Sequence, residues 1–429
     1  MSARNRELAA LVPAAALVTT GFASILILRG DEVGDLSVLF GAYFLAICLA
    51  THLMIRIRAS YADPYLFPLA AALAAFGLVM IYRIDEGLAR DQANWFVVGL
   101  AIFGLTIVLL RDYHVLERYR YVIATVGIGL LLMPRLPVIG SQVNGAYLGV
   151  DLGPIAFQPA EFAKLCVVVF LASYLREHRE VLTVGARRIA GMTIPPLKHF
   201  GPLLVVWGAA MLMLVFIRDL GSSLMFFGAF LAVLYVATNR LSFVVAGGAL
   251  FALGAWFFAG TVDHVGDRID IWLDPWADAE DTGFQVAQSL FAQADGGLFG
   301  QGIGSALLDL PGGATILPEA QTDLIYALIV NETGLFGATA LVCIYALIAS
   351  RGFQTAMIAP DGFSRLLAAG LTAVFILQAF VIIGGVTRVI PLTGVTLPFV
   401  SYGGSSVVAN MALLALLLLV SDRARRPQQ

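Results

Sequence analysis

Long apolar runs recur along the whole sequence, separated by short charged segments. A helix needs about 20 mostly apolar residues to cross a bilayer, and about twelve runs come close to that length or exceed it. Only 13% of the residues are charged, against about 25% in soluble domains. The sequence therefore predicts an all-α polytopic membrane protein. The predicted spans lie near residues 9–29, 37–55, 65–82, 94–110, 120–134, 159–175, 201–217, 221–237, 242–260, 323–349, 364–384 and 404–421.

The basic residues predict the orientation of these spans. Lys and Arg stay preferentially on the cytoplasmic side in short loops, and an arrangement with both termini inside places most of them there. The longest loop, residues 261–322, then faces outward. Its Gly-rich stretch from Gly296 to Gly304 follows no strand and does not match the dinucleotide fingerprint, so we interpret the loop as a flexible lid or a folded cap. A net charge of only −3, with scattered basic residues, indicates no nucleic-acid partner.

Two other outward segments, residues 135–158 and 385–403, are too apolar for ordinary wet loops. Their Pro and Gly residues interrupt regular helix. Broken backbone at membrane depth survives only where protein or a water-filled cavity satisfies its polar groups. We therefore expect both segments to line a cavity.

Ionisable residues inside the predicted spans are candidate functional residues, because each costs about 2.5–3.5 kcal/mol on insertion scales. Glu161 and Lys164 are three residues apart at the start of a span and can pair on one helical face. They either orient two helices or contact a substrate. Arg218 and Asp219 interrupt what would otherwise be one long helix, as a packing kink or as an anion site at a helix N-terminus.

The segment before the tenth span carries two carboxylates, Glu319 and Asp323, four residues apart. Thr322 or Asp323 can serve simply as a helix N-cap. Capping would leave Glu319 without a task, so a catalytic or metal-binding carboxylate is an equal alternative. Glu332 lies about two turns further along the same span.

Four motifs in this chain resemble, in order, those of the SEDS family, the peptidoglycan polymerases typified by RodA and FtsW. The first, FQPAEFAKL at Phe157–Leu165, is similar to the family signature FQPSE-x-x-K. The others are Asp219–Ser223, Leu317–Asp323, and PFVSYGGSS at Pro398–Ser406, which contains Ser401, Tyr402 and Ser405. The last motif, with Gly385–Arg388 ahead of it, most resembles RodA-type members from actinobacteria.

The resemblance implies a ten-span core at residues 61–422. Residues 1–60 would then be two additional N-terminal spans, and residues 423–429 a short basic cytoplasmic tail. The chain departs from the family after Asn144-Gly145-Ala146, where members commonly carry Arg-Arg-Trp and this sequence has Tyr147-Leu148-Gly149. Any substrate contact made by those arginines is therefore in doubt.

The implied activity is a glycosyltransferase that polymerises lipid II at the outer face of the bacterial cytoplasmic membrane. Asp323 matches the family's essential Asp and would be the base that activates the acceptor 4-hydroxyl. A pyrophosphate leaving group needs cations, and Lys164, Arg218 and Arg388 are available. The remaining substrate-binding candidates are Glu161, Asp219, Glu319, Ser401, Tyr402 and Ser405. A divalent cation, Mg or Mn, could bridge pyrophosphate to Glu319 or Asp323.

The implied partners are a single-span class B penicillin-binding protein and other proteins of the elongation or division complex. Two alternatives belong to different classes of protein. A lipid II flippase would use the broken helices as a midplane transport site, although the polar groups gather toward the outer side and we find no inverted repeat. A non-catalytic scaffold would not need Asp323.

Overall fold

The structure, a computed structural model, describes residues 2–30, 35–110, 112–137, 139–143, 146–153, 156–184, 187–189, 192–194, 219–260, 263–308 and 315–427. Within these ranges, eight helices are long and apolar enough to cross a membrane. The chain divides into two compact units. The first comprises Met1–Leu110, Asp267–Arg351 and Gln378–Gln429, and the second comprises Arg111–Gly266 and Gly352–Leu377.

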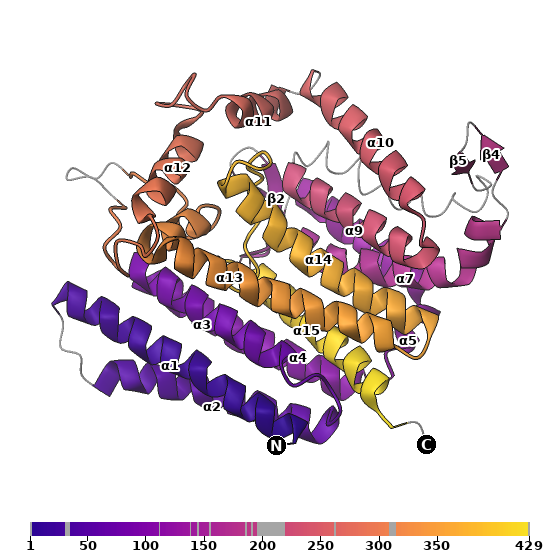
Figure 1. Ribbon diagram of the computed structural model, residues 1–429, viewed down its shortest axis with the longest axis horizontal. Helices are drawn as coiled ribbons and strands as arrows, with labels where there is room; N and C mark the ends of the chain where they lie inside the picture. Colours follow the sequence, from indigo (N-terminus) through magenta and orange to yellow (C-terminus); the bar gives the residue numbers. More distant parts are fainter. Residues whose placement is uncertain are drawn as a thin grey trace. The chain divides into compact units, whose positions relative to one another are not determined.

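The first unit is built from helices of the N-terminal third and the C-terminal third of the chain. Its members are α1 (Ala3–Arg29), α2 (Asp35–Arg58), α3 (Leu66–Ile84), α4 (Glu86–Leu109), most of α11 (Asp263–Leu273), α12 (Phe284–Gly296), the larger part of α13 (Ile325–Ile358), the end of α14 (Gly362–Val386), and α15 (Gly404–Arg425). Figure 1 shows α1, α2 and α3 side by side, and α12 beside the start of α13. The predicted outer loop is therefore a folded cap rather than a bare flexible lid.

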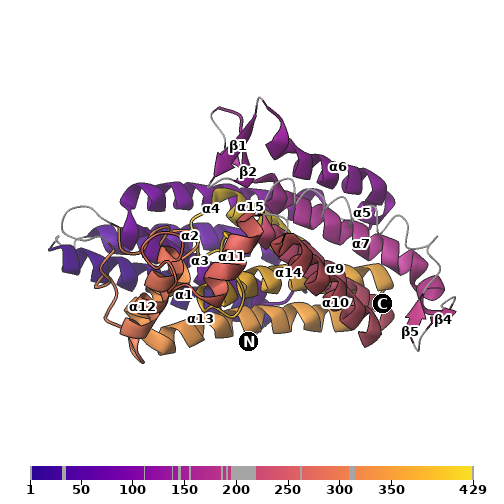
Figure 2. The same ribbon diagram turned by 90° about the horizontal axis from the view of Figure 1, so that it is seen from above.

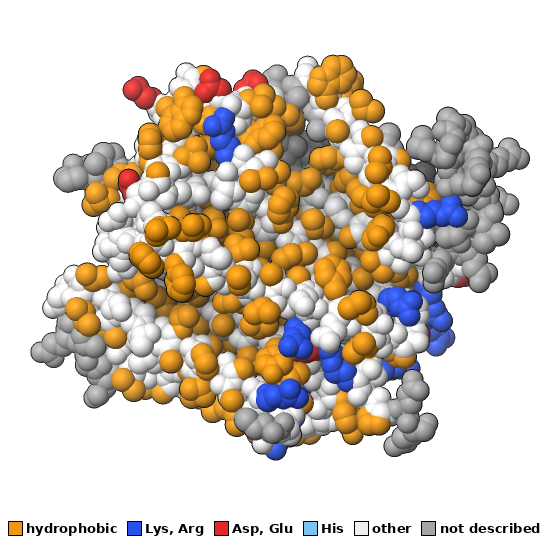
Figure 3. Space-filling view, in the orientation of Figure 1, with side chains coloured by type: hydrophobic (Ala, Val, Ile, Leu, Met, Phe, Trp, Pro, Cys, Tyr) orange, Lys and Arg blue, Asp and Glu red, His pale blue; other side chains and the backbone are white. Residues whose placement is uncertain are grey.

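Charged side chains separate to the two ends of this unit. In Figure 3, Lys and Arg gather near the start of α1 and the end of α15, whereas most Asp and Glu visible on this face lie around α11 and α12. The basic end is tied together by Asp63, which pairs with Arg425 at 2.9 Å and with Arg351 at 3.7 Å. This separation is the pattern that the positive-inside rule predicts for a chain with cytoplasmic termini.

The second unit contains α5 (Val115–Arg118), α6 (Arg120–Leu132), the 3₁₀ turn η1 (Met133–Arg135), α7 (Pro159–Val184), α9 (Leu220–Thr238) and α10 (Leu241–Ala259), together with the short strands β4 (Arg187–Ile189) and β5 (Met192–Ile194). Figure 2 shows α6 alongside α7. Gly127 of α6 makes this close packing possible, because a Cβ there would lie 2.8 Å from Cβ of Cys166.

The segment at residues 135–158, predicted to interrupt regular helix, forms a small antiparallel sheet in its described residues. β2 (Ala146–Asp151) pairs with both β1 (Gly140–Val143) and β3 (Ala156–Phe157), and Figure 2 shows the β1–β2 hairpin at one end of α6. Backbone N–H and C=O groups are obligatory hydrogen-bonding groups. The sheet satisfies them where Pro and Gly prevent a helix.

Eleven of the predicted spans coincide with helices of the structure, and the one at 201–217 lies outside the described residues. At 120–134 the helix is shorter than predicted, because α6 has 13 residues and ends at Leu132. It ends there because Pro134 follows in a 3₁₀ turn, and Pro cannot continue the helical hydrogen-bond ladder.

Asp361 is the N-terminal cap of α14. Its Oδ1 accepts from the Ser364 backbone N–H at 2.9 Å, and its Oδ2 accepts from the Ser364 hydroxyl at 2.6 Å. Burial raises the pKa of the Asp361 carboxyl, but these bonds and the neighbouring His114 outweigh burial and leave the pKa below its usual value.

We therefore expect Asp361→Ala to lower the free energy of unfolding by about 1 kcal/mol. The effect is pH-dependent, because a depressed folded-state pKa stabilises the protein above the unfolded-state pKa and stops doing so as pH falls through the folded-state pKa. Thermal unfolding of purified wild type and variant between pH 7 and pH 3 measures both effects. An equal difference in melting temperature at every pH would contradict the assigned role of the carboxylate.

Candidate functional site

Asp323 lies at the junction between the predicted outer loop and α13. A Cβ placed on Gly394 would be 3.5 Å from Asp323 Oδ2, so the carboxylate faces the backbone of the non-helical segment 387–403. Gly394 has φ +72°, a conformation that glycine adopts without strain. Two distant parts of the sequence thus meet at the predicted catalytic carboxylate.

Further hydrogen bonds hold segment 387–403 against this junction. The Ser401 hydroxyl donates to the Thr322 carbonyl at 2.7 Å and accepts from the Leu397 N–H at 2.9 Å. The Tyr402 N–H donates to the Gln321 carbonyl at 2.8 Å. Ser401 and Tyr402, predicted as substrate-binding residues, therefore position the backbone of the two residues that precede Asp323. Their role toward substrate stays a prediction. Ser405 is half-buried in the first turn of α15.

Glu319 closes the turn that precedes Asp323. Its Oε2 accepts from the Thr322 hydroxyl at 2.9 Å and from Gln321 Nε2 at 3.3 Å, and its carbonyl accepts from two backbone N–H groups. The residue itself has φ +52°, which is uncommon for a non-glycine residue. The sequence argument that capping would leave Glu319 without a task is therefore wrong, because this carboxylate organises the turn. Its role toward substrate stays a prediction.

Arg388 joins segment 387–403 to the end of α11. Its Nε donates to the Trp272 carbonyl at 2.7 Å, and its Nη2 donates to the Leu273 carbonyl. In return, Trp272 Nε1 donates to the Arg388 carbonyl at 3.1 Å. A cation at a helix C-terminus stabilises the unpaired carbonyls there. Arg388 thus anchors the cap, and pyrophosphate would have to compete with two backbone carbonyls for its guanidinium group.

In the second unit, Glu161 and Lys164 form the buried ion pair that their spacing predicts. Lys164 Nζ lies 2.5 Å from Glu161 Oε2 in the first turns of α7, and the exposed fractions of the two residues are 0% and 2%. Two ionised groups at this depth carry a large desolvation cost that is offset only by good geometry. The short distance between the two charges offsets this cost, which is consistent with either a structural or a substrate-contacting role.

Asp219 caps α9. Its Oδ1 accepts from the Ser222 N–H at 3.0 Å and its Oδ2 accepts from the Ser222 hydroxyl at 2.5 Å. The predicted interruption of the long apolar stretch is thus a helix start. Arg218, its predicted partner in anion binding, lies outside the described residues.

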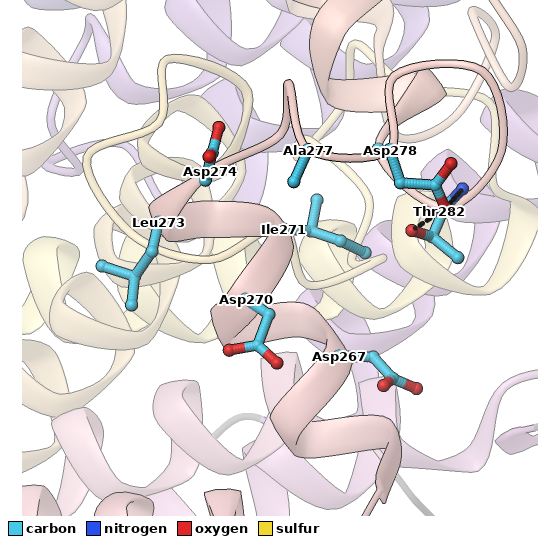
Figure 4. Close-up of a pocket in the computed structure, with 9 residues that line it drawn as sticks. Asp267, Asp270, Ile271, Leu273, Asp274, Ala277, Asp278 and Thr282 are labelled. Carbon is cyan, nitrogen blue, oxygen red and sulfur yellow. Dashed lines mark hydrogen bonds between the residues drawn. The ribbon is translucent and has the colours of Figure 1, made fainter.

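An acidic pocket lies beside α11, and Leu273, whose carbonyl accepts from Arg388, is among its lining residues. It encloses about 400 Å³ and is lined by Asp267, Asp270, Asp274, Asp278 and neighbouring residues. Figure 4 shows that these carboxylates point in different directions and that Asp278 instead bonds Thr282. In the part of the chain that the structure describes, no group of three or more His, Cys, Asp or Glu side chains could hold a metal ion. The described residues therefore provide no preformed metal cage, at Asp323 and Glu319 or elsewhere.

Two residues that are important for the site were not identified from the sequence. Gln92 of α4 is buried, donates to the Ser401 carbonyl at 3.1 Å and accepts from the Gly403 N–H at 3.1 Å. Arg83 of α3 pairs with Glu332 at 2.6 Å. Both lie within two residues of a predicted span end, where a polar side chain is expected anyway. Their burial was the missing signal, and it depends on tertiary packing.

Together, the fold and the site define a polytopic helical membrane protein with the polar groups of the candidate site at helix ends and in one non-helical segment. The profile of the FtsW, RodA and SpoVE cell cycle proteins matches residues 64–426. The chain therefore belongs to this family, which confirms the resemblance of the four motifs. The profile begins just before α3, after α1 and α2.

Individual relatives extend the match to the whole chain. The peptidoglycan glycosyltransferase RodA of Mycobacterium tuberculosis (strain ATCC 25618 / H37Rv) is 40% identical over 439 residues, covering 99% of this chain and 92% of that protein. Stage V sporulation protein E of Bacillus subtilis (strain 168) is 30% identical over 372 residues, covering 85% and 98%.

Solved structures have the same fold. One, from a study of polymerization and crosslinking by a peptidoglycan synthase complex, superimposes with a TM-score of 0.68 at 27% identity, covering 85% of this chain and 99% of that one. The Thermus thermophilus rod shape determining protein RodA gives a TM-score of 0.60 at 27% identity, covering 86% and 98%.

Proposed function

We propose that this protein is a peptidoglycan glycosyltransferase that polymerises lipid II into glycan strands at the outer face of the cytoplasmic membrane. The observation that carries the proposal is the placement of Asp323, whose carboxylate faces Gly394 at a junction fixed by Ser401. The glycosyltransferase names of full-length relatives support the same conclusion.

In the proposed reaction, Asp323 accepts the proton of the acceptor sugar's 4-hydroxyl. The hydroxyl oxygen then attacks the anomeric carbon of the donor with inversion. The new glycosidic C–O bond forms while the bond from that carbon to undecaprenyl pyrophosphate breaks, and the pyrophosphate leaves with the bonding electrons. A sugar hydroxyl is a poor nucleophile until a positioned base takes its proton, so a carboxylate held by its surroundings is the required element.

Negative charge that develops on the pyrophosphate needs cationic partners. Lys164 and Arg218 are the candidates on this chain, with Arg388 available only if it releases the carbonyls at the end of α11. A divalent cation would have to take most of its ligands from pyrophosphate and water, as Mg²⁺ commonly does, with Glu319 and Asp323 as its candidate protein ligands. No step above depends on it.

The proposal is tested by supplying labelled lipid II to the purified protein, alone and with a class B penicillin-binding protein. We expect ladder-forming glycan polymer on a gel. Movement of lipid II across proteoliposomes without polymer would support a flippase instead. Neither polymer nor movement in either setting would support a scaffold.

We also propose that both termini are cytoplasmic and that the α11–α12 cap faces outward. In a variant whose Cys48, Cys166 and Cys343 are replaced by Ser, we expect Asp278→Cys to react with a membrane-impermeant maleimide in intact cells. The matched variant Arg426→Cys should react only after the membrane is opened, because it lies at the opposite, basic end of the same unit. The reverse labelling pattern would contradict the orientation and the outward-facing mechanism.

A single-span class B penicillin-binding protein is the proposed partner, within an elongation or division complex. The support is the likeness to a structure described as coordinating polymerization and crosslinking, since a strand that is polymerised by one protein must be cross-linked by another activity.

A further inference from the structure

The proposed function gives no task to the Gly-rich stretch of the outer loop or to the buried Glu332. The structure brings the two together at a break in α13. At Gly334 the backbone leaves helical geometry, with φ 66° and ψ −171°. The N–H groups of Leu335 and Phe336 consequently bond the carbonyls of Gly297 and Leu298, at 2.9 and 3.1 Å.

The break also frees two carbonyls of α13 for the same stretch. The Gln301 N–H donates to the Asn331 carbonyl at 2.9 Å, and the Gly302 N–H donates to the Glu332 carbonyl at 3.0 Å. Two intrahelical bonds are thus replaced by four bonds to the segment 297–306, which we call the strap. Every backbone group released by the break is satisfied, as its burial requires.

Glycine is needed here for close backbone approach. A Cβ on Gly300 would lie 2.2 Å from the Glu332 carbonyl oxygen, and one on Gly334 would lie 2.4 Å from the Gly300 nitrogen. The stretch therefore packs backbone against backbone, which is the physical reason for its glycines.

A buried ion pair fastens the end of the strap. Glu332 Oε1 lies 2.6 Å from Arg83 Nε and accepts from the Ala306 N–H at 3.4 Å. The other branch of the guanidinium donates to the carbonyls of Gly304, at 3.2 Å, and Ala306. The side chain of Glu332 is fully buried and that of Arg83 is 12% exposed. One Arg fork thereby joins α3, α13 and the strap.

The end of α1 contacts both the strap and the end of α3. A Cβ on Gly304 would lie 2.7 Å from Leu28 Cδ1, and Arg29 Nη2 donates to the Tyr82 carbonyl at 3.1 Å, next to Arg83. Helix α1, which precedes the part of the chain matched by the family profile, therefore contacts the α3 end and the strap.

We propose that Arg83 and Glu332 are positioning residues, which fasten the strap to the break in α13 and so hold Asp323 in place for proton transfer. This inference rests on the proposed function. The first part of α13 follows Asp323 directly. Its near end is fixed by the bond from Ser401 to Thr322, and its far end is fixed by the strap. Freedom at the far end would let the carboxylate shift relative to the acceptor hydroxyl.

The test compares Arg83→Met and Glu332→Gln with the double variant Arg83→Met/Glu332→Leu in the full chain. Each single variant should lower the melting temperature, because one buried charged or polar group loses its partner, whereas the apolar double variant should recover much of that loss. The double variant still lacks the bonds from Arg83 to the strap. We expect its kcat on lipid II to stay about tenfold to a hundredfold below wild type, because a small misplacement of a catalytic group costs a factor of this size. KM should change little.

Hydrogen exchange supplies a readout that does not depend on activity. Amides in residues 297–306 should exchange faster in all three variants. Arg83→Lys is the milder variant, because it keeps the charge but loses the planar fork, so it should fold normally and show faster exchange with a smaller loss of kcat. Glu86→Gln is the matched control. It breaks the exposed pair of Glu86 with Arg29, in which the Arg29 side chain is 33% exposed and the Glu86 side chain 57% exposed. It should change neither the exchange of residues 297–306 nor kcat.

Two results would overturn the inference: unchanged exchange of residues 297–306 in the Arg83 variants, or wild-type kcat in the folded double variant. If either result is obtained while Asp323→Asn is inactive, only the positioning role of Arg83 and Glu332 is refuted. Full activity of Asp323→Asn, or no polymer from wild type, would count against the proposed function itself.

Discussion

Replacing Asp323 with Asn should nearly abolish polymerisation of lipid II, because the amide cannot accept the proton of the acceptor hydroxyl. A positioned general base contributes about 10²–10⁴-fold to a rate, so we expect kcat to fall by about that factor with little change in KM. The amide is nearly isosteric, so packing against Gly394 and the bond from Ser401 to Thr322 should persist. Rates are measured by gel quantification of labelled polymer.

The matched control for this variant is Asp270→Asn, which removes an exposed carboxylate from α11 in the same unit. It should polymerise at the wild-type rate, which would show that loss of one negative charge from this unit is not the cause. Wild-type polymer yield from Asp323→Asn would remove this residue as the base and direct attention to another carboxylate.

The second large effect is expected at the buried pair of α7. In Lys164→Met, Glu161 keeps its buried position but loses the cation at 2.5 Å. Breaking a buried ion pair by removing one partner typically costs about 3–5 kcal/mol. We therefore expect a clear fall in melting temperature and in polymer yield, measured on the same purified sample.

The double variant Glu161→Gln/Lys164→Met separates the two roles that the sequence left open. Without either charge, much of the stability should return, because no uncompensated ion is buried. If Lys164 contributes charge to the leaving pyrophosphate, polymer yield stays low in spite of that recovery. Recovery of both stability and yield would assign the pair to helix packing alone.

The long apolar runs predicted the helices well because a span must be long and apolar whatever its neighbours are. It predicted the short backbone excursions poorly. The sheet at residues 140–157 depends on strand pairing within that segment, and the break of α13 at Gly334 depends on which distant segment receives the freed backbone bonds. Gln92 and Arg83 were missed for a related reason: at a predicted span end, a polar side chain is unremarkable until packing buries it.

The motifs identified the site residues, but the structure redistributed their tasks. Glu319 closes its own turn, Ser401 fastens Thr322, Asp219 caps α9, and Arg388 holds the end of α11. The partners of Glu319 and Asp219 are three residues away, but Ser401 and Arg388 bond backbone carbonyls that lie 79 and 116 residues away along the chain. Sequence spacing contains no information about such partners.

By itself, the sequence determined that this protein is a polytopic helical membrane protein with carboxylates at the start of a predicted span, because bilayer thickness and the cost of buried charge act on local sequence. The tertiary structure alone decided that Asp323 faces Gly394, that the Gly-rich stretch is a strap on α13 rather than a phosphate loop, and that Arg83 fastens it. The physical reason is that hydrogen bonds between distant backbone segments and the burial of an ion pair arise only when those segments pack together.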